Sequence, residues 1–330
     1  MIYIFTPTPP FVQKLQPLSI HTPNHTQPII TSQHNTTANQ LAAFEQPKYA
    51  DWSLAVVTVG NISVLLIGQN TYLADQETRV LEYNVSSDDV LQAEQFAALS
   101  MTRERHTANV LLNDSLLIVC GCVQSDRCER TCEWMNLTRL ASVKRTDRFN
   151  ANSWSTLSMP VCGRGHSTTT LNNQGDLIVV AGHCPQPGGA EVQPHVYAFN
   201  PIGRVWRKLK NLPQTLAHHA AATLNGVVHV CGGMELNGKA TDNCYKYDQK
   251  QNEWVKIAKM TTKRTKFVLV AVEDWMYALG GTDGERLRYD SIEIYSAKEK
   301  TWSLLDPTLE APSDELAATV VMESTLLSEL

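Results

Sequence analysis

The densest group of potentially reactive side chains is the cysteine cluster CGCVQSDRCERTC, residues 120–132. Four thiolates this close together could bind zinc, but their spacing does not match the usual C-x2-C pairs, and Cys120 lies in an apolar segment. The alternatives are free thiols or a disulfide among Cys122, Cys128 and Cys132. We therefore expect no metal here, whereas Cys231, in another apolar segment, is expected to fill the core as a thiol.

Arginines and histidines recur just before several apolar segments, and two interpretations stay open for them. They could hydrogen-bond the backbone at junctions, as buried polar groups must, or form a basic rim that receives acidic peptides. Two long polar insertions, 122–142 and 183–195, are further candidates for partner binding. The candidate partner-binding residues are Arg103, Arg105, His106, Arg127, Arg130, Trp134, Met135, Arg164, His166, His183, His218 and Arg264.

Catalytic signatures are absent from the sequence. There is no H-E-x-x-H, G-x-S-x-G, P-loop, dinucleotide fingerprint or acidic calcium loop, and no sialidase aspartate box. We assign no catalytic residue and no cofactor, and we expect that the protein is not an enzyme.

Composition and charge are those of a soluble globular protein. The 330 residues are 43% apolar and 18% charged, and the net charge of −5 argues against nucleic acid or an anionic membrane as the main partner. The start, MIYIFTPTPP, lacks the features of a secretory signal, which predicts a cytoplasmic protein. Secretion is the alternative, because N-x-S/T triplets begin at Asn24, Asn35, Asn61, Asn84, Asn113 and Asn136.

A short apolar segment that ends in glycine occurs five times. The glycines, at positions 68, 121, 182, 232 and 280, are 53, 61, 50 and 48 residues apart. Each segment follows another apolar segment across a turn such as Asn225-Gly226, which is typical of a tight β-hairpin. Regular recurrence at this period indicates a repeat architecture.

An aromatic residue followed seven positions later by Trp completes three of the repeats. In the second repeat the pair is Phe149 and Trp154, and in the first Tyr83 is followed by Val90. The residues expected to be structural are Gly68, Gly121, Gly182, Gly232, Gly233, Gly280, Gly281, Tyr83, Trp154, Phe199, Trp206, Tyr247, Trp254, Tyr295 and Trp302.

Each repeat therefore predicts four short strands, and such units bury their faces by packing around an axis as a β-propeller. Glycine would allow close approach of neighbouring backbone, and Trp would fill the gap between blades. A phosphate-binding loop would instead occur once and open a helix.

This pattern resembles the kelch repeat. The similarity is strongest in HHAAATLNGVVHVCGG…CYKYDQKQNEWVKIAKMTTKR and WMYALGG…SIEIYSAKEKTW, within residues 218–302, and extends over roughly residues 50–330. Earlier repeats depart from the pattern, because Gln69, Cys122 and His183 replace the second glycine. The spacing is that of the kelch half of BTB-kelch adaptor proteins.

We predict an all-β, six-bladed kelch propeller with four antiparallel strands per blade. The expected blades are 54–100, 106–160, 166–212, 218–260, 266–306 and a composite of 315–330 with 28–45, after an irregular segment 1–27. In the composite blade, 28–34 and 40–44 would be the outer strands. Alternatively, residues 2–5 could form its second strand. Leu41 and Val90 stand where Trp is expected, so we predict looser packing beside this blade.

The resemblance implies a protein-interaction module, a rigid scaffold that binds a protein or peptide through loops at one face. It could be the substrate-recognition part of a ubiquitin-ligase adaptor, with actin or cytoskeleton binding as the alternative. A sugar-acid epimerase or oxidase on such a propeller is a second alternative. A BTB domain, which links such adaptors to a cullin, would not fit in the roughly 50 residues before the first repeat. Two alternatives therefore stay open: a stand-alone propeller, or the recognition fragment of a longer BTB-kelch protein. The partner, its face and the oligomeric state do not follow from the sequence.

Overall fold

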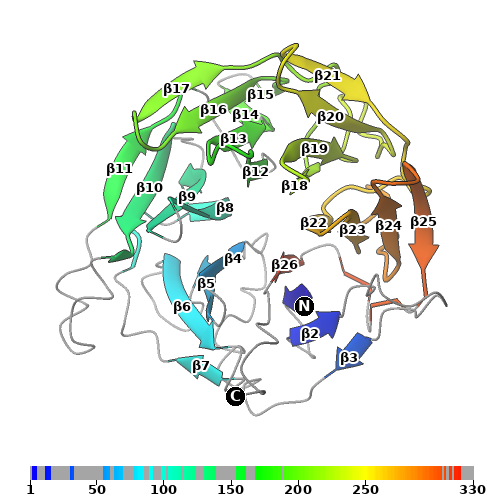
Figure 1. The fold of residues 1–330 in the computed structure, drawn as a ribbon, viewed down its shortest axis with the longest axis horizontal. Coiled ribbons are helices and arrows are strands. Elements are labelled where there is room, and N and C mark those ends of the chain that lie inside the picture. The colour runs from blue at the N-terminus through cyan, green and yellow to red at the C-terminus, as the bar shows by residue number, and fades with distance from the viewer. Residues whose placement is uncertain are drawn as a thin grey trace.

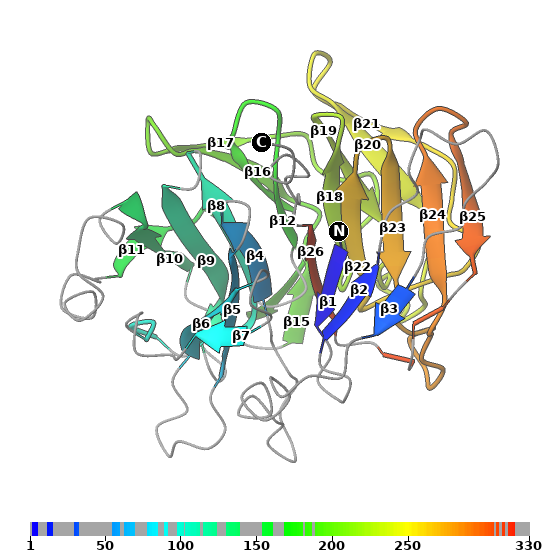
Figure 2. The same ribbon diagram turned by 60° about the horizontal axis from the view of Figure 1, so that its bottom comes forward.

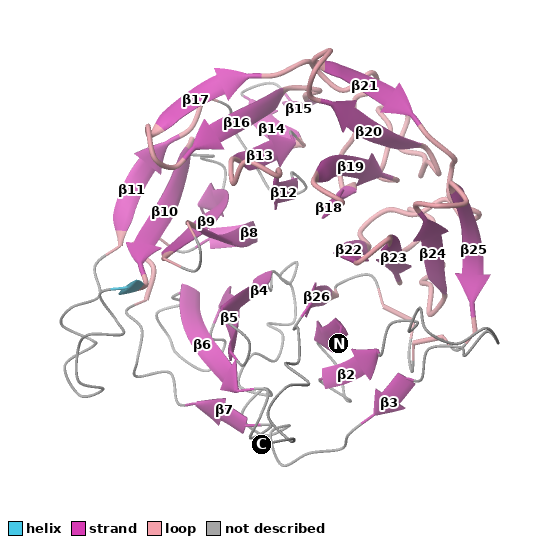
Figure 3. Ribbon diagram, in the orientation of Figure 1, coloured by secondary structure: helices cyan, strands magenta, loops and turns pink. Residues whose placement is uncertain are grey.

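The computed structural model is built from β-strands (Figures 1 and 3). No helix in the described part of the chain is long and apolar enough to cross a membrane. The residues that the structure describes are 2–5, 12–15, 30–32, 55–59, 63–69, 78–84, 89–91, 98–101, 103–112, 115–123, 130–138, 154–160, 168–180, 182–186, 189–306, 308–309, 312–313 and 316–320.

Four consecutive blades lie between β8 and β25, each a four-stranded antiparallel sheet. Their strands are β8 (Arg103–Leu111), β9 (Leu116–Val123), β10 (Thr131–Asn136) and β11 (Ser155–Ser158); β12 (Thr168–Leu171), β13 (Leu177–Val180), β16 (Val196–Asn200) and β17 (Val205–Lys208); β18 (Ala220–Leu224), β19 (Val227–Cys231), β20 (Cys244–Asp248) and β21 (Glu253–Lys256); and β22 (Val268–Val272), β23 (Trp275–Leu279), β24 (Ile292–Ser296) and β25 (Thr301–Leu305).

Two further four-stranded sheets flank these blades. One contains β4 (Ala55–Val59), β5 (Ser63–Gln69), β6 (Thr78–Asn84) and β7 (Asp89–Leu91), and the other has the order β26 (Ala317–Val320), β1 (Ile2–Phe5), β2 (Val12–Leu15) and β3 (Ile30–Ser32). Figures 1 and 2 show the sheets arranged around a common axis, with β4, β8, β12, β18, β22 and β26 innermost. The prediction of an all-β propeller is confirmed. The number of blades in the complete ring stays a prediction.

The hairpin turns have the backbone conformation that their sequences predict. Asn225 and Gly226 have φ angles of 50° and 74°, and Glu273 occupies the equivalent turn with φ 52°. The outer turns repeat this feature two residues before each Trp, since Arg204, Asn252 and Lys300 have φ between 52° and 58°. Positive φ matches the turn to the twist of the paired strands, so each blade keeps its register.

Each seven-residue aromatic spacing corresponds to a cross-strand pair. Phe199 faces Trp206, Tyr247 faces Trp254, and Tyr295 faces Trp302 in paired third and fourth strands. The ring centroids of these pairs lie between 4.9 and 5.3 Å apart. Tyr83 and Val90 face each other in the same way in β6 and β7. Residues seven positions apart in the repeat therefore face each other in the two strands joined by the outer turn.

The Trp side chains also connect neighbouring blades. The Nε1–H of Trp206 donates to the carbonyl of Ser158 in the preceding blade at 2.9 Å. Trp254 donates to Lys210 at 2.9 Å, and Trp302 donates to Ala258 at 3.1 Å. Each indole thus fills the gap between blades and uses its polar atom there, as a buried indole requires.

Close backbone approach explains the glycine pair. A Cβ atom on Gly232 would lie 2.6 Å from the carbonyl oxygen of Arg264 in the next blade, and one on Gly233 would lie 2.8 Å from Cβ of His219. The N–H of Gly233 donates to that same Arg264 carbonyl at 2.7 Å. The pair is therefore a contact between blades rather than a phosphate-binding loop.

The N-terminal segment pairs with the C-terminal strand differently from our main expectation. β1 pairs with β26, with Ile2 opposite Val320, and β2 lies between β1 and β3. Residues 2–5 therefore supply the second strand, as in our alternative register, and residues 12–15 were wrongly assigned to an irregular segment. The expected strand 40–44 lies outside the described residues.

Two insertions are more regular than expected. Residues 131–136, which we assigned to the loop 122–142, form the third strand β10, and Met135 occupies the place expected for Phe149. Within 183–195, β14 (His183–Gln186) pairs with β15 (Gly189–Val192) as a hairpin. The wrong assignment in β10 arose because its only large aromatic, Trp134, faces away from the gap between blades that Met135 fills. Phe149 itself lies outside the described residues.

Candidate interaction surface

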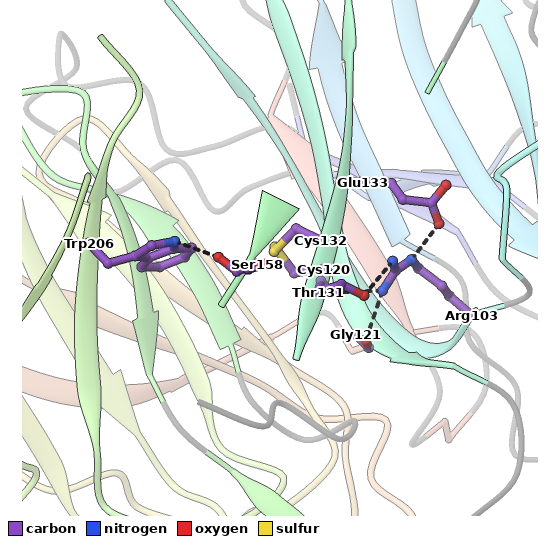
Figure 4. The surroundings of a disulfide bond; sticks show 8 residues. All are labelled: Arg103, Cys120, Gly121, Thr131, Cys132, Glu133, Ser158 and Trp206. Atoms are coloured by element: carbon purple, nitrogen blue, oxygen red, sulfur yellow. Dashed lines mark hydrogen bonds and ion pairs between the residues drawn. A yellow bond between two sulfur atoms is a disulfide. The ribbon is translucent and has the colours of Figure 1, made fainter. Parts of the chain in front are cut away.

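Arg103, a candidate for the basic rim, lies entirely inside the second blade. Its Nε–H donates to Oε1 of Glu133 at 2.9 Å, and both side chains are fully buried. One terminal nitrogen also donates to the carbonyls of Gly121 and Thr131, at 3.0 and 2.9 Å (Figure 4). Glu133 in turn accepts the N–H and hydroxyl of Ser100 at 2.7 and 2.6 Å. The guanidinium thus connects three segments of one blade.

Arg264 repeats this network in the β22–β25 blade. It donates to Glu293 at 3.0 Å and to the carbonyls of Gly280 and Ser291 at 2.6 and 2.9 Å. Glu293 accepts the N–H of Thr261 at 2.6 Å. Because Arg103 and Arg264 are fully enclosed, assigning them to a partner-binding rim was wrong, and the backbone-bonding interpretation applies to both.

The candidate histidines differ in burial. His106 is buried, its Nε2–H donates to the Ile67 carbonyl of the preceding sheet at 2.8 Å, and burial lowers its pKa to about 4. Burial also lowers the pKa of His219, which directly precedes β18, to about 4. His218 is half-buried, and its carbonyl accepts the N–H of Lys266. His106 is therefore a junction residue, and its assignment to a binding rim was wrong.

Trp134 and Met135 point to opposite environments. Met135 is 1% exposed and packs in the core between the β4–β7 sheet and the β8–β11 blade, so its assignment as an interface anchor was wrong. Trp134 is half-buried, and the guanidinium carbon of Arg204 lies 5.1 Å from its ring centroid. Trp134 thus stays a candidate surface residue.

The remaining candidates are only partly described. Arg130 is exposed, and its carbonyl accepts the N–H of Met159. Arg105 and His183 lie in β8 and β14, but their side chains are outside the described set. Arg127, Arg164 and His166 fall outside the described residues altogether.

The cysteine predictions are corrected by two disulfides. Cys120 and Cys132 face each other in β9 and β10 and are bonded (Figure 4). Cys231 and Cys244 are bonded across β19 and β20. Cys120 was wrongly left out of the possible pairs, and Cys231 is not a free core thiol. Sequence spacing did not reveal these pairs because each joins residues that face each other only after the strands pair. Cys128 lies outside the described residues.

Two grooves between blades open on the edge that carries the hairpin turns. One, of about 270 Å³, lies between the β8–β11 blade and the next, and includes Trp134, Phe199 and Arg204. The other, of about 380 Å³, lies between the β18–β21 and β22–β25 blades. Its lining residues are Leu224, Asn225, Val227, His229, Lys246, Val255, Lys256, Ile257, Ala258, Tyr295, Ala297 and Lys300. Sequence reasoning missed both grooves, although the lysines of β20 and β21 were visible as outward positions.

Charged residues are unevenly distributed over the innermost strands. Five of the six innermost strands have no charged residue: β4, β12, β18, β22 and β26 have the sequences AVVTV, TTTL, AAATL, VLVAV and AATV. The sixth, β8, has the sequence RERHTANVL, and its Arg103 and His106 are buried. Within the described ranges, no group of three or more His, Cys, Asp or Glu residues is placed to hold a metal ion.

The fold and its repeated contacts define a kelch-type β-propeller. Residues 140–289 match the family model described as Attractin/LZTR1 beta-propeller. The chain is 36% identical to Kelch-like protein 36 of Rattus norvegicus over 102 residues, and 31% identical to Kelch-like protein 35 of Mus musculus over 144 residues. The propeller is thus close to the kelch half of kelch-like proteins.

These matches cover parts of longer proteins. They span 30% and 43% of this chain but only 16% and 24% of the two relatives. A solved structure entitled "Structure of YjhT" superposes with a TM-score of 0.54 at 16% sequence identity, and covers 66% of this chain and 69% of that chain. That likeness shows the fold alone.

Proposed function

We propose that this propeller is a non-enzymatic module that binds a protein or peptide partner at one edge of the ring. The observation that carries the proposal is the contrast between buried charged side chains and open grooves. Inside the blades, fully buried arginines pair with fully buried glutamates: Arg103 with Glu133, and Arg264 with Glu293. Two grooves between blades, in contrast, open to solvent. The similarity to kelch-like proteins supports the same conclusion.

Affinity capture with the full chain, followed by mass spectrometry, tests this proposal. We expect recovery of a protein partner in a fixed ratio to the propeller. A parallel incubation with a panel of sialic acids tests the enzymatic alternative. Turnover of a sugar acid without any protein partner would refute the proposal.

A narrower form of the proposal makes the partner a substrate of a ubiquitin ligase, to which a BTB domain would connect the propeller. This form requires the cytoplasm, which we predicted from the sequence. The two disulfides and the N-x-S/T triplets instead favour an oxidising compartment. Treatment of the expressed protein with an N-glycosidase separates the two, because a loss of mass would place the chain in the secretory pathway and exclude the ligase form.

We also propose that six blades form a closed ring, with both ends of the chain in the last blade. The pairing of β26 with β1 supports this arrangement. So does the hydroxyl of Thr58 in β4, which lies 2.8 Å from the Thr319 hydroxyl and donates to the Val320 carbonyl at 2.8 Å. In the variant Thr58→Cys/Thr319→Cys, we expect an oxidative cross-link that reduction reverses. Failure to form it, with native melting behaviour, would refute a closed ring.

A further inference from the structure

The two grooves between blades occupy equivalent places in the repeat but carry different chemistry. Leu116 and Val227 begin the second strand of their blades, and both line their groove. Across each groove, the third-strand aromatic of the next blade and the positive-φ residue of its outer turn complete the wall. These pairs are Phe199 with Arg204 in one groove and Tyr295 with Lys300 in the other.

Charge distinguishes the groove between the β18–β21 and β22–β25 blades, which we call the lysine groove. Lys246, Lys256 and Lys300 line it, all three are exposed, and no carboxylate is among its lining residues. The ion pairs found in the described part of the chain do not involve these lysines. One carboxylate, that of Asp274, touches the rim and accepts the side-chain amide of Asn225 at 2.8 Å.

The lysine groove also has an apolar floor. Leu224 and Tyr295 are almost fully buried, and Val227 and Ile257 are partly exposed beside them. His229 adds a neutral ring, because its Nδ1–H donates to the Val227 carbonyl at 2.8 Å and burial lowers its pKa. An apolar anchor could therefore enter the groove while negative groups on either side meet the lysines.

We propose that the lysine groove binds an acidic segment of a protein partner, in which an apolar side chain is flanked by carboxylates. The occupant follows from charge complementarity: three unpaired cations surround an apolar floor on a chain whose net charge is −5. The inference deepens the proposed function, on which it rests, by locating the binding site and stating the chemistry of the partner. Equivalent position does not make the other groove a similar site, because Trp134 stands where this one has Lys246.

Fluorescence anisotropy with a labelled Glu-Glu-Leu-Glu-Glu peptide tests this inference, with Lys-Lys-Leu-Lys-Lys as the comparison peptide. We expect the acidic peptide alone to bind, and its binding to weaken when NaCl rises from about 0.05 to about 0.5 M. The variant Lys246→Glu/Lys256→Glu/Lys300→Glu should weaken binding at least about tenfold. The neutral variant Lys246→Gln/Lys256→Gln/Lys300→Gln should weaken it less.

A matched control reverses three exposed cations at the opposite edge of the same blades. Lys239, Lys263 and Arg286 lie in loops that follow β19, β21 and β23, away from the hairpin turns. Their joint replacement by Glu changes the net charge equally and should alter peptide affinity by less than about twofold. Equal losses in both variants, or no loss in either neutral or reversed groove variants, would overturn the proposal.

The failure of this inference can be distinguished from failure of the proposed function. If the protein partner found by affinity capture is retained by the lysine-reversed variant, the lysine groove is not the binding site, although the module still binds proteins. If the wild-type chain binds neither the acidic peptide nor a protein, both proposals fail. Melting temperatures of all variants show whether a loss of binding reflects a loss of folding.

Discussion

Replacement of Glu293 by Gln tests whether the buried ion pair is held together by charge. Gln keeps the size of the side chain and one hydrogen-bond acceptor, but removes the negative charge beside Arg264. Both partners are fully buried, and burial lowers the pKa of Arg264 while Glu293 opposes that shift. The substitution would leave the cation without a counter-charge in a dry environment.

The expected cost follows from the contacts that remain. Breaking a buried ion pair by removal of one partner costs about 3–5 kcal/mol. Arg264 would still donate to the carbonyls of Gly280 and Ser291, at 2.6 and 2.9 Å, which partly stabilise the charge. We therefore expect Glu293→Gln to lower the free energy of unfolding by about 3 kcal/mol, near the lower limit.

The neighbouring blade suggests a rescue. The equivalent bridges Ala217–Met234 and Thr265–Thr282 place Leu216 at the position of Arg264. That blade also has Pro213 at the position of Thr261, so it lacks the N–H that Glu293 accepts in the other blade. The β18–β21 blade thus shows that an apolar residue can occupy the position of Arg264. We expect Arg264→Leu to restore about 2 kcal/mol in the Glu293→Gln background, because the unpaired buried charge is gone.

Urea denaturation followed by tryptophan fluorescence measures these changes. The wild type, Glu293→Gln, Arg264→Leu and the variant with both substitutions form a double-mutant cycle. Lys259→Gln provides the control, because its ion pair with Asp242 is 3.3 Å long and the lysine is 68% exposed. That change should cost less than about 1 kcal/mol. A cost below about 1 kcal/mol for Glu293→Gln, or no coupling with Arg264→Leu, would refute the reasoning.

Three further predictions concern a histidine, a glycine and a disulfide. The pKa of His219 is lowered to about 4, so the folded protein favours its neutral form. The free energy of unfolding should therefore fall by on the order of 3 kcal/mol between pH 6.5 and pH 4. In denaturation measured at each pH, His219→Phe should remove this pH-dependent loss of stability. Gly280→Ala should lower the melting temperature, with a cost of about 3 kcal/mol, because its Cβ would lie 2.5 Å from the Ser313 carbonyl. The variant Cys231→Ala/Cys244→Ala, which opens a link across 13 residues, should lower the free energy of unfolding in urea by about 3 kcal/mol.

Each of these predictions has its own control. Phe267 occupies the place of His219 in the next blade, so the aromatic replacement fits a known environment; an unchanged pH profile would contradict the histidine argument. Gly238 also has positive φ, but a Cβ there would have no neighbour within 4 Å, so Gly238→Ala should cost less than Gly280→Ala. For the disulfide, the wild type and the double variant are compared in oxidising and in reducing buffer, because reduction also opens the Cys120–Cys132 bond in both proteins. The wild type should be the more stable only in oxidising buffer, and equal stability of the two oxidised proteins would contradict the prediction.

The repeat spacing made the fold predictable, but the roles of several residues could not be predicted from the sequence. Arg103 is the first residue of the inner strand β8, and Arg264 precedes the inner strand β22. At such positions a sequence gives no indication of whether a guanidinium faces inward or outward. The signal that could have found their roles is a glutamate 30 and 29 residues later, at Glu133 and Glu293. Such a partner is recognisable only once the third strand of the blade has been located, and in the second blade that strand was misplaced.

Local backbone and packing preferences are written into the sequence of this chain. Turn residues such as Asn225-Gly226, and the spacing of seven positions between Tyr247 and Trp254, specify hairpins because strand pairing fixes the distance across a turn. The register of β1 against β26, the two disulfides, the burial of Arg264 and the lysine groove were decided by the tertiary structure. Each of these features joins segments that are distant in sequence or lie in different strands or blades, so its geometry exists only after the sheets have packed around their axis.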